Sequence, residues 1–229
     1  MPPRILVIIP AYNEEKSIAK VIRDIPQGLV TEIVVVNNNS RDDTANQARQ
    51  AGATVLQEPR QGYGFACLKG IDYSKNLPQP PDLVVFLDAD YSDHPEEMPK
   101  LIAPILTGEY DLVIGSRALG TREKGAMLPQ QIFGNWLATT LLRWFYGTRF
   151  TDLGPFRAIR FERLLAIGMR DTTYGWTVEM QLKAAKAGLR CGEVPVTYRK
   201  RIGVSKVSGT IKGTVLAGYK IITTIFKYL

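Results

Sequence analysis

The sequence predicts an α/β domain built on a mostly parallel sheet that is flanked by helices. Short runs of β-branched and other apolar residues alternate with helical segments through the first half of the chain. These runs are apolar on both faces, which is typical of strands buried between two layers of helices. The length of 229 residues suits one large domain, and 45% hydrophobic residues are enough to bury a core.

Each element of the first half has its own signal. Buried strands are predicted at residues 5–9, 32–36, 54–56, 83–87 and 112–114. Ile18, Val21, Ile22 and Ile25 follow the spacing of a helix between the first two strands. A second helix is predicted to start at a capping box over residues 40–43, and a third near Pro95.

The second half is less regular. Helices are predicted at 130–146 and 179–187, and a strand at 191–198. Trp136 and Trp144 lie on the first of these helices, and we expect them in the core, because packing is the commoner cause of an amphipathic pattern.

The tail, residues 209–229, is predicted to form an amphipathic helix appended to a domain of residues 1–208. Lys220 and Lys227 lie opposite an apolar face formed by Ile211, Val215, Ile222, Ile225, Phe226 and Leu229. This pattern fits a helix packed on the domain and equally one lying in a membrane interface.

Charge is unevenly distributed along the chain. Residues 1–150 hold 15 Lys and Arg against 17 Asp and Glu, whereas residues 151–229 hold 14 against five. The basic final third predicts an acidic partner there, namely nucleic acid, anionic lipid or a phosphorylated substrate. The basic residues form no recognised nucleic-acid module, so a nucleic-acid partner is not expected.

Targeting signals are missing from the sequence. There is no signal-peptide pattern and no apolar stretch long enough to cross a bilayer. Cys67 and Cys191 are expected to be reduced thiols. We therefore expect a cytoplasmic protein, either soluble or peripheral at the inner face of the membrane.

The strongest chemical signal is Asp88-Ala89-Asp90, directly after the predicted strand 83–87. Two carboxylates at this spacing can converge on one hard cation, which in turn binds phosphate oxygens. Ligands of open α/β sheets bind at the carboxyl ends of the strands. The motif therefore predicts a divalent metal site.

Three further segments follow strands and predict a nucleotide site around that metal. They are residues 10–14, 37–40 and 60–64. Tyr12 could stack on a base, and Asn and Glu side chains could read its hydrogen-bonding edge. Gly62 and Gly64 permit close backbone approach to a ligand.

These motifs occur in a recognisable order. Residues 10–14, 37–44, 62–64, 88–90, 115–117, 154–157, 193–195 and 201–206 resemble those of glycosyltransferase family two. More narrowly, the chain resembles the dolichyl-phosphate mannosyltransferase branch, whose catalytic domain has the Rossmann-like GT-A fold. The resemblance covers nearly all of the chain up to Lys206.

The resemblance implies a role for each matching residue. Asp88 and Asp90 would hold Mg²⁺ or Mn²⁺ against the donor pyrophosphate, and Asp90 would also act in catalysis. Arg117 and Arg157 would bind an acceptor phosphate. The remaining donor-site residues would be Pro10, Ala11, Tyr12, Glu14, Asn37, Asn38, Arg60, Gly62, Gly64 and Ala89, with Arg201 and Lys206 closing over the donor phosphates.

Two departures from the family pattern concern the donor and the metal. Asn37-Asn38 stands where the family usually has two aspartates, so a negative charge is lost and UDP versus GDP stays open. Ser92 stands where the mannosyltransferases often have a glutamine that serves as a further metal ligand.

The implied reaction is an inverting, one-step transfer of a hexose from a nucleotide-diphosphate sugar of the UDP-glucose or GDP-mannose type. The favoured acceptor is a polyprenyl or other lipid phosphate, which is already ionised near neutral pH and needs no base. Partners would be an anionic membrane surface or a membrane-embedded protein. One alternative is transfer to a lipid or glycan hydroxyl with Glu179 as base, and another is a non-catalytic nucleotide-sugar-binding subunit. A nucleotidyltransferase that makes a nucleotide sugar is a third, although residues 10–14 are not the glycine-rich, lysine-bearing phosphate loop expected of one.

Overall fold

The centre of the protein is a mixed, mostly parallel sheet. The computed structural model describes residues 2–204 and 211–229, and in this part of the chain seven strands form one sheet in the order β3-β2-β1-β4-β6-β5-β7. The strands are β1 (Ile5–Ala11), β2 (Glu32–Asn37), β3 (Thr54–Gln57), β4 (Leu83–Phe86), β5 (Leu112–Ser116), β6 (Arg157–Arg160) and β7 (Cys191–Pro195).

Strand direction decides where a ligand can bind. β1 pairs in parallel with β2 on one side and with β4 on the other, with Ile8 opposite both Val34 and Phe86. β6 is antiparallel to its neighbours β4 and β5. The chain order thus reverses beside β1, which leaves a crevice at the carboxyl ends of β1 and β4.

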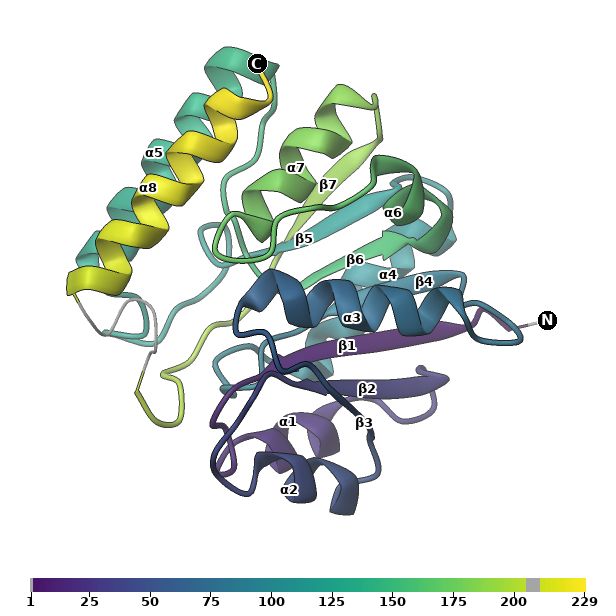
Figure 1. Ribbon diagram of the computed structural model, residues 1–229. Coiled ribbons are helices and arrows are strands. Elements are labelled where there is room, and N and C mark those ends of the chain that lie inside the picture. Colours follow the sequence, from purple (N-terminus) through teal and green to yellow (C-terminus); the bar gives the residue numbers. More distant parts are fainter. Residues whose placement is uncertain (1, 205–210) are drawn as a thin grey trace.

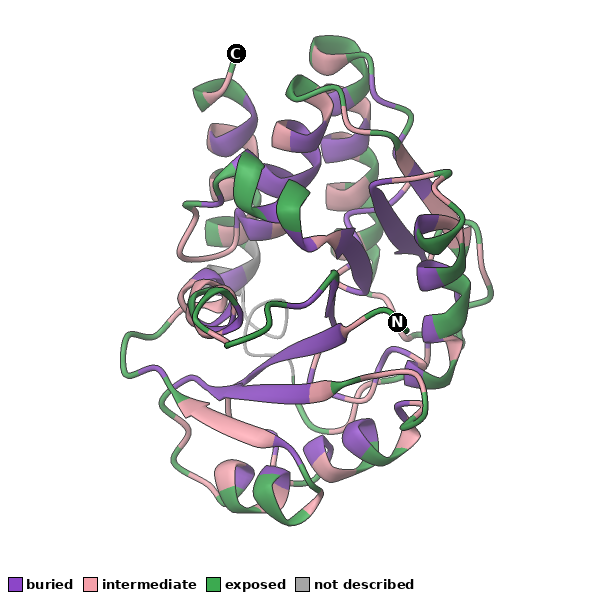
Figure 2. Ribbon diagram, turned by 90° about the vertical axis from the view of Figure 1, so that its right-hand side faces the viewer, coloured by how far each residue is buried: buried purple, intermediate pink, exposed green. Residues whose placement is uncertain are grey.

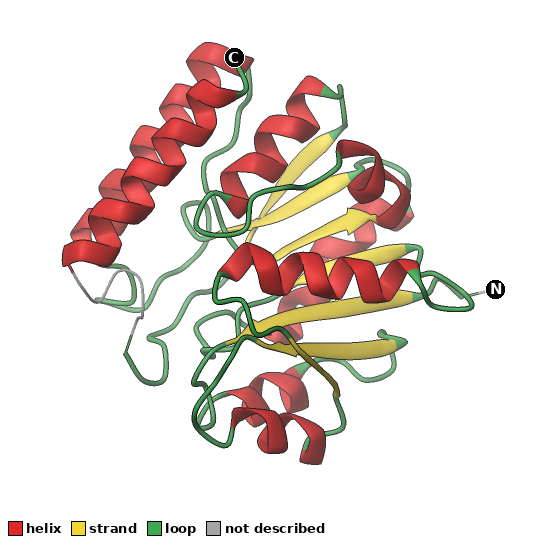
Figure 3. Cartoon of the chain, viewed as in Figure 1, coloured by secondary structure: helices red, strands yellow, loops and turns green. Residues whose placement is uncertain are grey.

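Helices cover both faces of the sheet (Figures 1 and 3). One side carries α1 (Ile18–Asp24), α2 (Thr44–Gln50), a 3₁₀ turn at Pro95–Glu97 and α4 (Met98–Leu106). The other side carries α3 (Tyr63–Lys75), α6 (Phe161–Ile167) and α7 (Trp176–Lys186), with α5 (Pro129–Tyr146) and α8 (Ile211–Lys227) packed beside α7.

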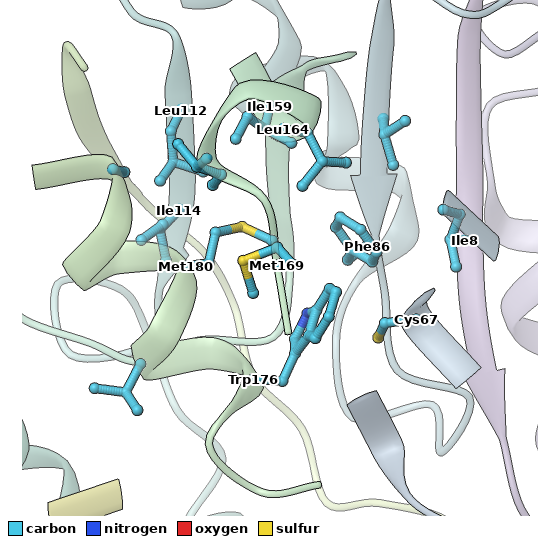
Figure 4. Close-up of a cluster of buried hydrophobic side chains, with 14 of the residues drawn as sticks. Ile8, Cys67, Phe86, Leu112, Ile114, Ile159, Leu164, Met169, Trp176 and Met180 are labelled. Atoms are coloured by element: carbon cyan, nitrogen blue, oxygen red, sulfur yellow. The ribbon is translucent and has the colours of Figure 1, made fainter. Parts of the chain in front are cut away.

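Alternation along the strands produces two hydrophobic cores, one on each face of the sheet. Leu6 and Ile8 face the α3–α7 side, whereas Ile5, Val7 and Ile9 face the α1–α4 side. In the first core Phe86 meets Trp176 edge to face, with ring centroids 5.8 Å apart (Figure 4). This contact joins β4, which leads into the Asp88 motif, to the start of α7.

The predicted α/β architecture is confirmed, with differences at individual elements. β3 was predicted to be a buried strand, but it is an edge strand whose residues are half-buried or exposed, because it pairs with β2 alone. The capping box at 40–43 was also wrong: α2 starts at Thr44 with no side-chain cap, and the Ser40 hydroxyl accepts from the Asn13 amide instead. Helices α3 and α6 and strand β6 were not predicted.

The largest correction concerns α5. Trp136 and Trp144 were expected in the core, yet they are 58% and 75% exposed. Only the opposite stripe of α5, including Ala138 and Leu142, is buried. An amphipathic pattern identifies an apolar face without saying what covers it.

The tail helix is divided in the same way. Ile225 is fully buried against the domain, and the Tyr146 hydroxyl donates to its carbonyl at 2.6 Å. We define the α5–α8 apolar surface as the exposed large side chains of this pair: Leu128, Ile132, Phe133, Trp136, Trp144, Phe145, Val215, Leu216, Tyr219, Phe226 and Leu229. Most residues of the central strands, by contrast with this helix surface, are buried (Figure 2). Among the described helices, none has both the length and the apolar character required to cross a membrane.

The start of α3 must approach the segment before α7 closely. A Cβ added to Gly64 would lie 2.0 Å from the Asp171 carbonyl oxygen, whereas one added to Gly134 in α5 would meet nothing within 4 Å. We predict that Gly64→Ala lowers the free energy of unfolding by roughly 1–3 kcal/mol through overpacking.

The matched variant Gly134→Ala should leave stability unchanged or raise it by about 0.5–1 kcal/mol, because alanine is the better helix former. Urea denaturation of both variants checks this. Equal midpoints for the two would mean that the contact between α3 and residue 171 is not tight.

Candidate active site

A cavity of about 530 Å³ lies at the carboxyl ends of β1 and β4. The segments that follow these two strands converge on it, together with the start of α3 and the segment before α7. Its walls are formed by Pro10, Ala11, Tyr12, Glu14, Asn38, Gln61, Gly62, Tyr63, Asp88, Ala89, Asp90, Thr173, Tyr174 and Arg201. Ten of these residues were predicted from the sequence.

The paired carboxylates Asp88 and Asp90 line this cavity. The Tyr63 hydroxyl donates to Asp88 Oδ1 at 3.0 Å, and the Ser92 amide donates to Asp90 Oδ1 at 2.9 Å. Burial, together with the neighbouring charge of Asp90, raises the pKa of Asp88 to about 7. Two carboxylates that repel each other in a half-buried site are stabilised by a cation between them.

The donor set fits a divalent cation that is shared with a phosphate ligand. Among the described residues, no cluster of three or more His, Cys, Asp or Glu side chains could hold a metal by itself. Mg²⁺ commonly binds one or two carboxylates and completes its shell with water and substrate phosphates. Asp88 and Asp90 are therefore suited to such a bridging cation.

Arg201 lines the cavity and bridges two of its carboxylates. Its guanidinium lies 2.8 Å from Glu14 Oε1 and 3.1 Å from Asp90 Oδ2. Glu14 Oε2 also accepts from the Ser17 hydroxyl, so the carboxylate is held in a fixed orientation. A ligand that uses Glu14 or a metal that uses Asp90 must share these groups with Arg201, or displace it. Lys206, the other predicted phosphate ligand, lies outside the described residues.

The two asparagines after β2 hold loops. The Asn38 amide donates to the carbonyls of Glu58 and Arg60, and its oxygen accepts from the Gly62 amide at 2.8 Å. Asn37 donates to Gln57 Oε1 at 2.8 Å and does not line the cavity. We expected both to contact the base. Instead, the side chain of Asn38 holds the 58–62 loop, and that of Asn37 bonds to Gln57 on β3 and accepts from the Ser40 amide.

Arg60 and Gly64 also lie off the cavity wall. Arg60 pairs with Glu58 at 2.9 Å and stacks on the Phe65 ring, with its side chain 66% exposed. Gly64 provides close approach, as expected, but to the backbone of residues 171 and 172 rather than to a ligand.

Four cavity residues were not predicted as site residues: Gln61, Tyr63, Thr173 and Tyr174. The first two lie inside the 60–64 segment that the sequence singled out. The other two come from the segment before α7, which carries no motif. It reaches the cavity because the Phe65 amide donates to the Thr172 carbonyl at 3.1 Å.

Arg117 lies beside the cavity, in a bidentate pair with Asp152 at 2.6 and 2.8 Å. Both side chains are nearly buried, and the positive charge of Arg117 helps to offset the repulsion at Asp88. Asp93 lies nearby, 1% exposed, and neither of its carboxylate oxygens has a hydrogen-bond partner among the described residues. Burial, with the charges of Asp88 and Asp90, raises the pKa of Asp93 well above its usual range and favours the neutral acid.

The prediction that Arg157 binds an acceptor phosphate does not agree with the structure. Its side chain is fully buried, and its guanidinium donates to the carbonyls of Leu153, Gly154 and Thr177. Burial lowers the pKa of Arg157 to about 10. The residue therefore ties β6 to the start of α7 and has no face open to a ligand.

Glu179 is likewise placed away from the cavity. Its carboxylate accepts from the amides of Arg170 and Asp171, from Tyr228 Oη at 2.7 Å and from Lys183 Nζ at 2.8 Å. Burial alone would raise its pKa, but these hydrogen bonds outweigh burial and lower the pKa below its ordinary value. A buried carboxylate with all of its acceptor positions used is poorly suited to be the general base that we considered.

The raised Asp88 pKa predicts pH-dependent metal binding. Because the carboxyl must lose its proton to bind a cation, Mn²⁺ affinity should rise up to about tenfold per pH unit below pH 7 and level off above it. Calorimetric titration between about pH 5.5 and about pH 8.5 measures this. An affinity that stays constant across the range would contradict a protonated Asp88.

Comparisons with known proteins identify the family of this chain. The family model for glycosyl transferase family 2 matches residues 6–168. A glycosyltransferase of Mycobacterium tuberculosis (strain ATCC 25618 / H37Rv), itself uncharacterised, is 38% identical over 221 residues, covering 93% of this chain and 94% of the relative. The undecaprenyl-phosphate mannosyltransferase of Micrococcus luteus is 32% identical over 225 residues, covering 92% and 90% of the two chains.

A solved structure extends the similarity to three dimensions. Glucosyl-3-phosphoglycerate synthase from Mycobacterium tuberculosis, in complex with Mn²⁺, UDP-glucose and phosphoglyceric acid, superposes with a TM-score of 0.77. It is 26% identical, and the match covers 99% of this chain and 79% of that one. The family match spans well over half of the sequence and includes the strands that build the cavity. The chain therefore belongs to glycosyl transferase family 2.

Proposed function

We propose that this protein transfers a hexose from a nucleotide-diphosphate sugar to a polyprenyl phosphate, with a divalent cation and with inversion at the anomeric carbon. The observation that carries the proposal is the cavity at the β1–β4 crevice, with Asp88 and Asp90 inside it and Tyr12 and Glu14 on its wall. Its volume of about 530 Å³ is in the range of small-molecule sites.

The donor would lie along the cavity from β1 towards β4. Tyr12 is half-buried and offers a ring face to a base, and Glu14 offers a fixed carboxylate oxygen. The Arg201 guanidinium already pairs with Glu14 at 2.8 Å and with Asp90 at 3.1 Å. It could therefore release these carboxylates and bind the donor phosphates instead. Arginine suits this exchange because its planar fork matches phosphate oxygens.

Asp88 and Asp90 would hold Mg²⁺ or Mn²⁺, which supplies positive charge to the departing diphosphate. Tyr63 and Ser92 orient these carboxylates through the hydrogen bonds they donate. A phosphate acceptor brings its own charged nucleophile, since its second pKa is about 6. The chain then needs to position the acceptor and exclude water, and no general base is required.

A lipid-linked acceptor is supported by three features. The Micrococcus luteus relative is named for undecaprenyl phosphate. The final third of the chain is strongly basic. The α5–α8 apolar surface exposes two tryptophans together with Phe133, Phe145 and Phe226, a composition that favours a membrane interface. We infer that this surface binds the membrane peripherally.

Donor binding tests the proposal first. We predict that UDP-glucose or GDP-mannose binds in the presence of Mn²⁺, and that Asp90→Ala weakens this binding at least about a hundredfold by removing a metal ligand. Asp72→Ala, which removes an exposed carboxylate on α3 outside the cavity, should bind like the wild type. Calorimetry with each donor measures both variants. Absence of binding by either donor would count against a nucleotide-sugar site.

The identity of the acceptor is tested next, with the donor that binds in the calorimetric titration. Transfer to a polyprenyl phosphate and not to the matching polyprenol supports the phosphate acceptor. Transfer to the polyprenol would mean that a hydroxyl is the acceptor, and then a base other than Glu179 would be needed, because Glu179 is buried away from the cavity.

Membrane binding is tested separately. We predict that Trp136→Ser with Trp144→Ser lowers partitioning onto phospholipid vesicles at least about tenfold, because each exposed ring loses its apolar burial in the interface. Leu106→Ser, an exposed apolar residue on α4 across the sheet, is the control and should have little effect. Vesicle co-sedimentation measures the difference, and equal partitioning of all forms would remove the α5–α8 surface from the proposal.

A further inference from the structure

A second cavity, of about 250 Å³, lies between α8 and the segment that precedes α7. We name it the rear cavity; its lining includes Arg170, Asp171, Thr172, Lys220, Thr224, Lys227 and Tyr228. None of them lines the candidate active site, and none belongs to a motif that pointed to the family. It contains charged and hydroxyl groups from two elements that are far apart in sequence.

Cations outnumber acids in the rear cavity. Lys220 Nζ lies 3.1 Å from Asp171 Oδ2, so one lysine is paired. Within residues 2–204 and 211–229, no acidic side chain pairs with Lys227 or with the Arg170 guanidinium. The nearby Glu179 carboxylate is buried and is already paired with Lys183 at 2.8 Å. The cavity therefore has an excess of two positive charges.

The sequence placed Lys220 and Lys227 opposite the apolar face of the tail helix and left open whether that helix packs on the domain or lies in a membrane interface. In the structure Lys220 pairs with Asp171, Lys227 lies 5.5 Å from the centre of the Tyr228 ring, and both lysines line this cavity. Like charges held in one concave site repel each other, and an anion bound between them relieves that repulsion.

We propose that the rear cavity binds a phosphate group. Arg170 offers a planar fork and the lysines offer ammonium groups, which together match the oxygens of a tetrahedral anion. The Thr224 hydroxyl is a further donor on the same wall. The volume is below the range of drug-sized ligand sites, which suits a phosphate with a small substituent such as glycerol.

Two sources can supply this chemistry: the headgroup of an anionic phospholipid, or a free phosphate. The rear cavity is formed partly by α8, the helix that also carries Val215, Leu216, Tyr219 and Phe226 of the α5–α8 apolar surface.

Phosphate binding in the rear cavity does not depend on the hexosyl transfer proposed above, because none of its lining residues lines the candidate active site.

The rear cavity shares a wall with the candidate active site. Asp171 and Thr172 line the rear cavity, whereas Thr173 and Tyr174 line the active site. Asp171 Oδ1 accepts from the Thr173 amide at 2.8 Å and from the Gly175 amide at 3.1 Å. An anion that competes with Asp171 for Lys220 therefore acts on the segment that shapes both cavities.

The test compares two double variants of equal charge change in the full chain. Arg170→Gln with Lys227→Gln removes two cations of the rear cavity, and Arg143→Gln with Arg149→Gln removes two exposed cations near the end of α5, outside it. We expect the first pair to weaken calorimetric binding of inorganic phosphate or glycerol phosphate about twentyfold, and the second pair less than about twofold. Thermal melting confirms that both variants fold.

Vesicles of phosphatidylglycerol, compared with phosphatidylcholine, identify the source. If inorganic phosphate binds and competes with the vesicles, a free phosphate is sufficient. If only phosphatidylglycerol vesicles bind, and the first variant loses that binding more than the second, the ligand is a lipid headgroup. The proposal is overturned if both variants lose binding equally, or if the wild type binds neither phosphate probe nor the anionic vesicles. Donor titration of the same variants keeps this result separate from the fate of the active site.

Discussion

Parallel pairing of β1 with β2 on one side and with β4 on the other is the constraint on which the rest of the structure depends. Since the three strands run in the same direction, their carboxyl ends meet at one edge of the sheet, and the segments after them are brought together. The chain leaves β1 towards β2 and later returns to β4, so a crevice opens between the two. Tyr12 and Glu14 thereby come to share a cavity with Asp88 and Asp90, although more than 70 residues separate the two pairs in sequence.

Buried charges stabilise the walls of that cavity without entering it. Arg157 binds three backbone carbonyls, Glu179 accepts two backbone amides, and Arg117 pairs with Asp152. Each holds an irregular segment of the chain in place, and leaving any of these charges unpaired would be costly in a buried setting. These residues matter for positioning, and their effect on activity would pass through the segments they hold.

The segment before α7 connects two chemically different parts of the molecule. Its backbone packs against Gly62 and Gly64 at the start of α3, its Thr173 and Tyr174 face the candidate active site, and Arg170 and Asp171 face the rear cavity beside α8. The α5–α8 pair in turn exposes aromatic side chains on the outside of the domain. The candidate active site and the rear cavity thus lie beside one short segment, and α8 links the rear cavity to the α5–α8 apolar surface.

The sequence by itself determined the α/β class, most strands, the paired carboxylates and the segments that surround them, because those features depend on local pattern and on residues next to strand ends. Only the tertiary structure decided the rest. Arg157 and Glu179 look like site residues in sequence, but long-range contacts turn them into internal ties. Trp136 and Trp144 indicate an apolar face on a helix, but the sequence does not say whether another element covers that face. In the structure the packing of α5 leaves both side chains exposed. Thr173 and Tyr174 reach the active site only because two glycines let distant backbones touch, and burial, neighbouring charge and close approach are properties of the folded chain that no local pattern encodes.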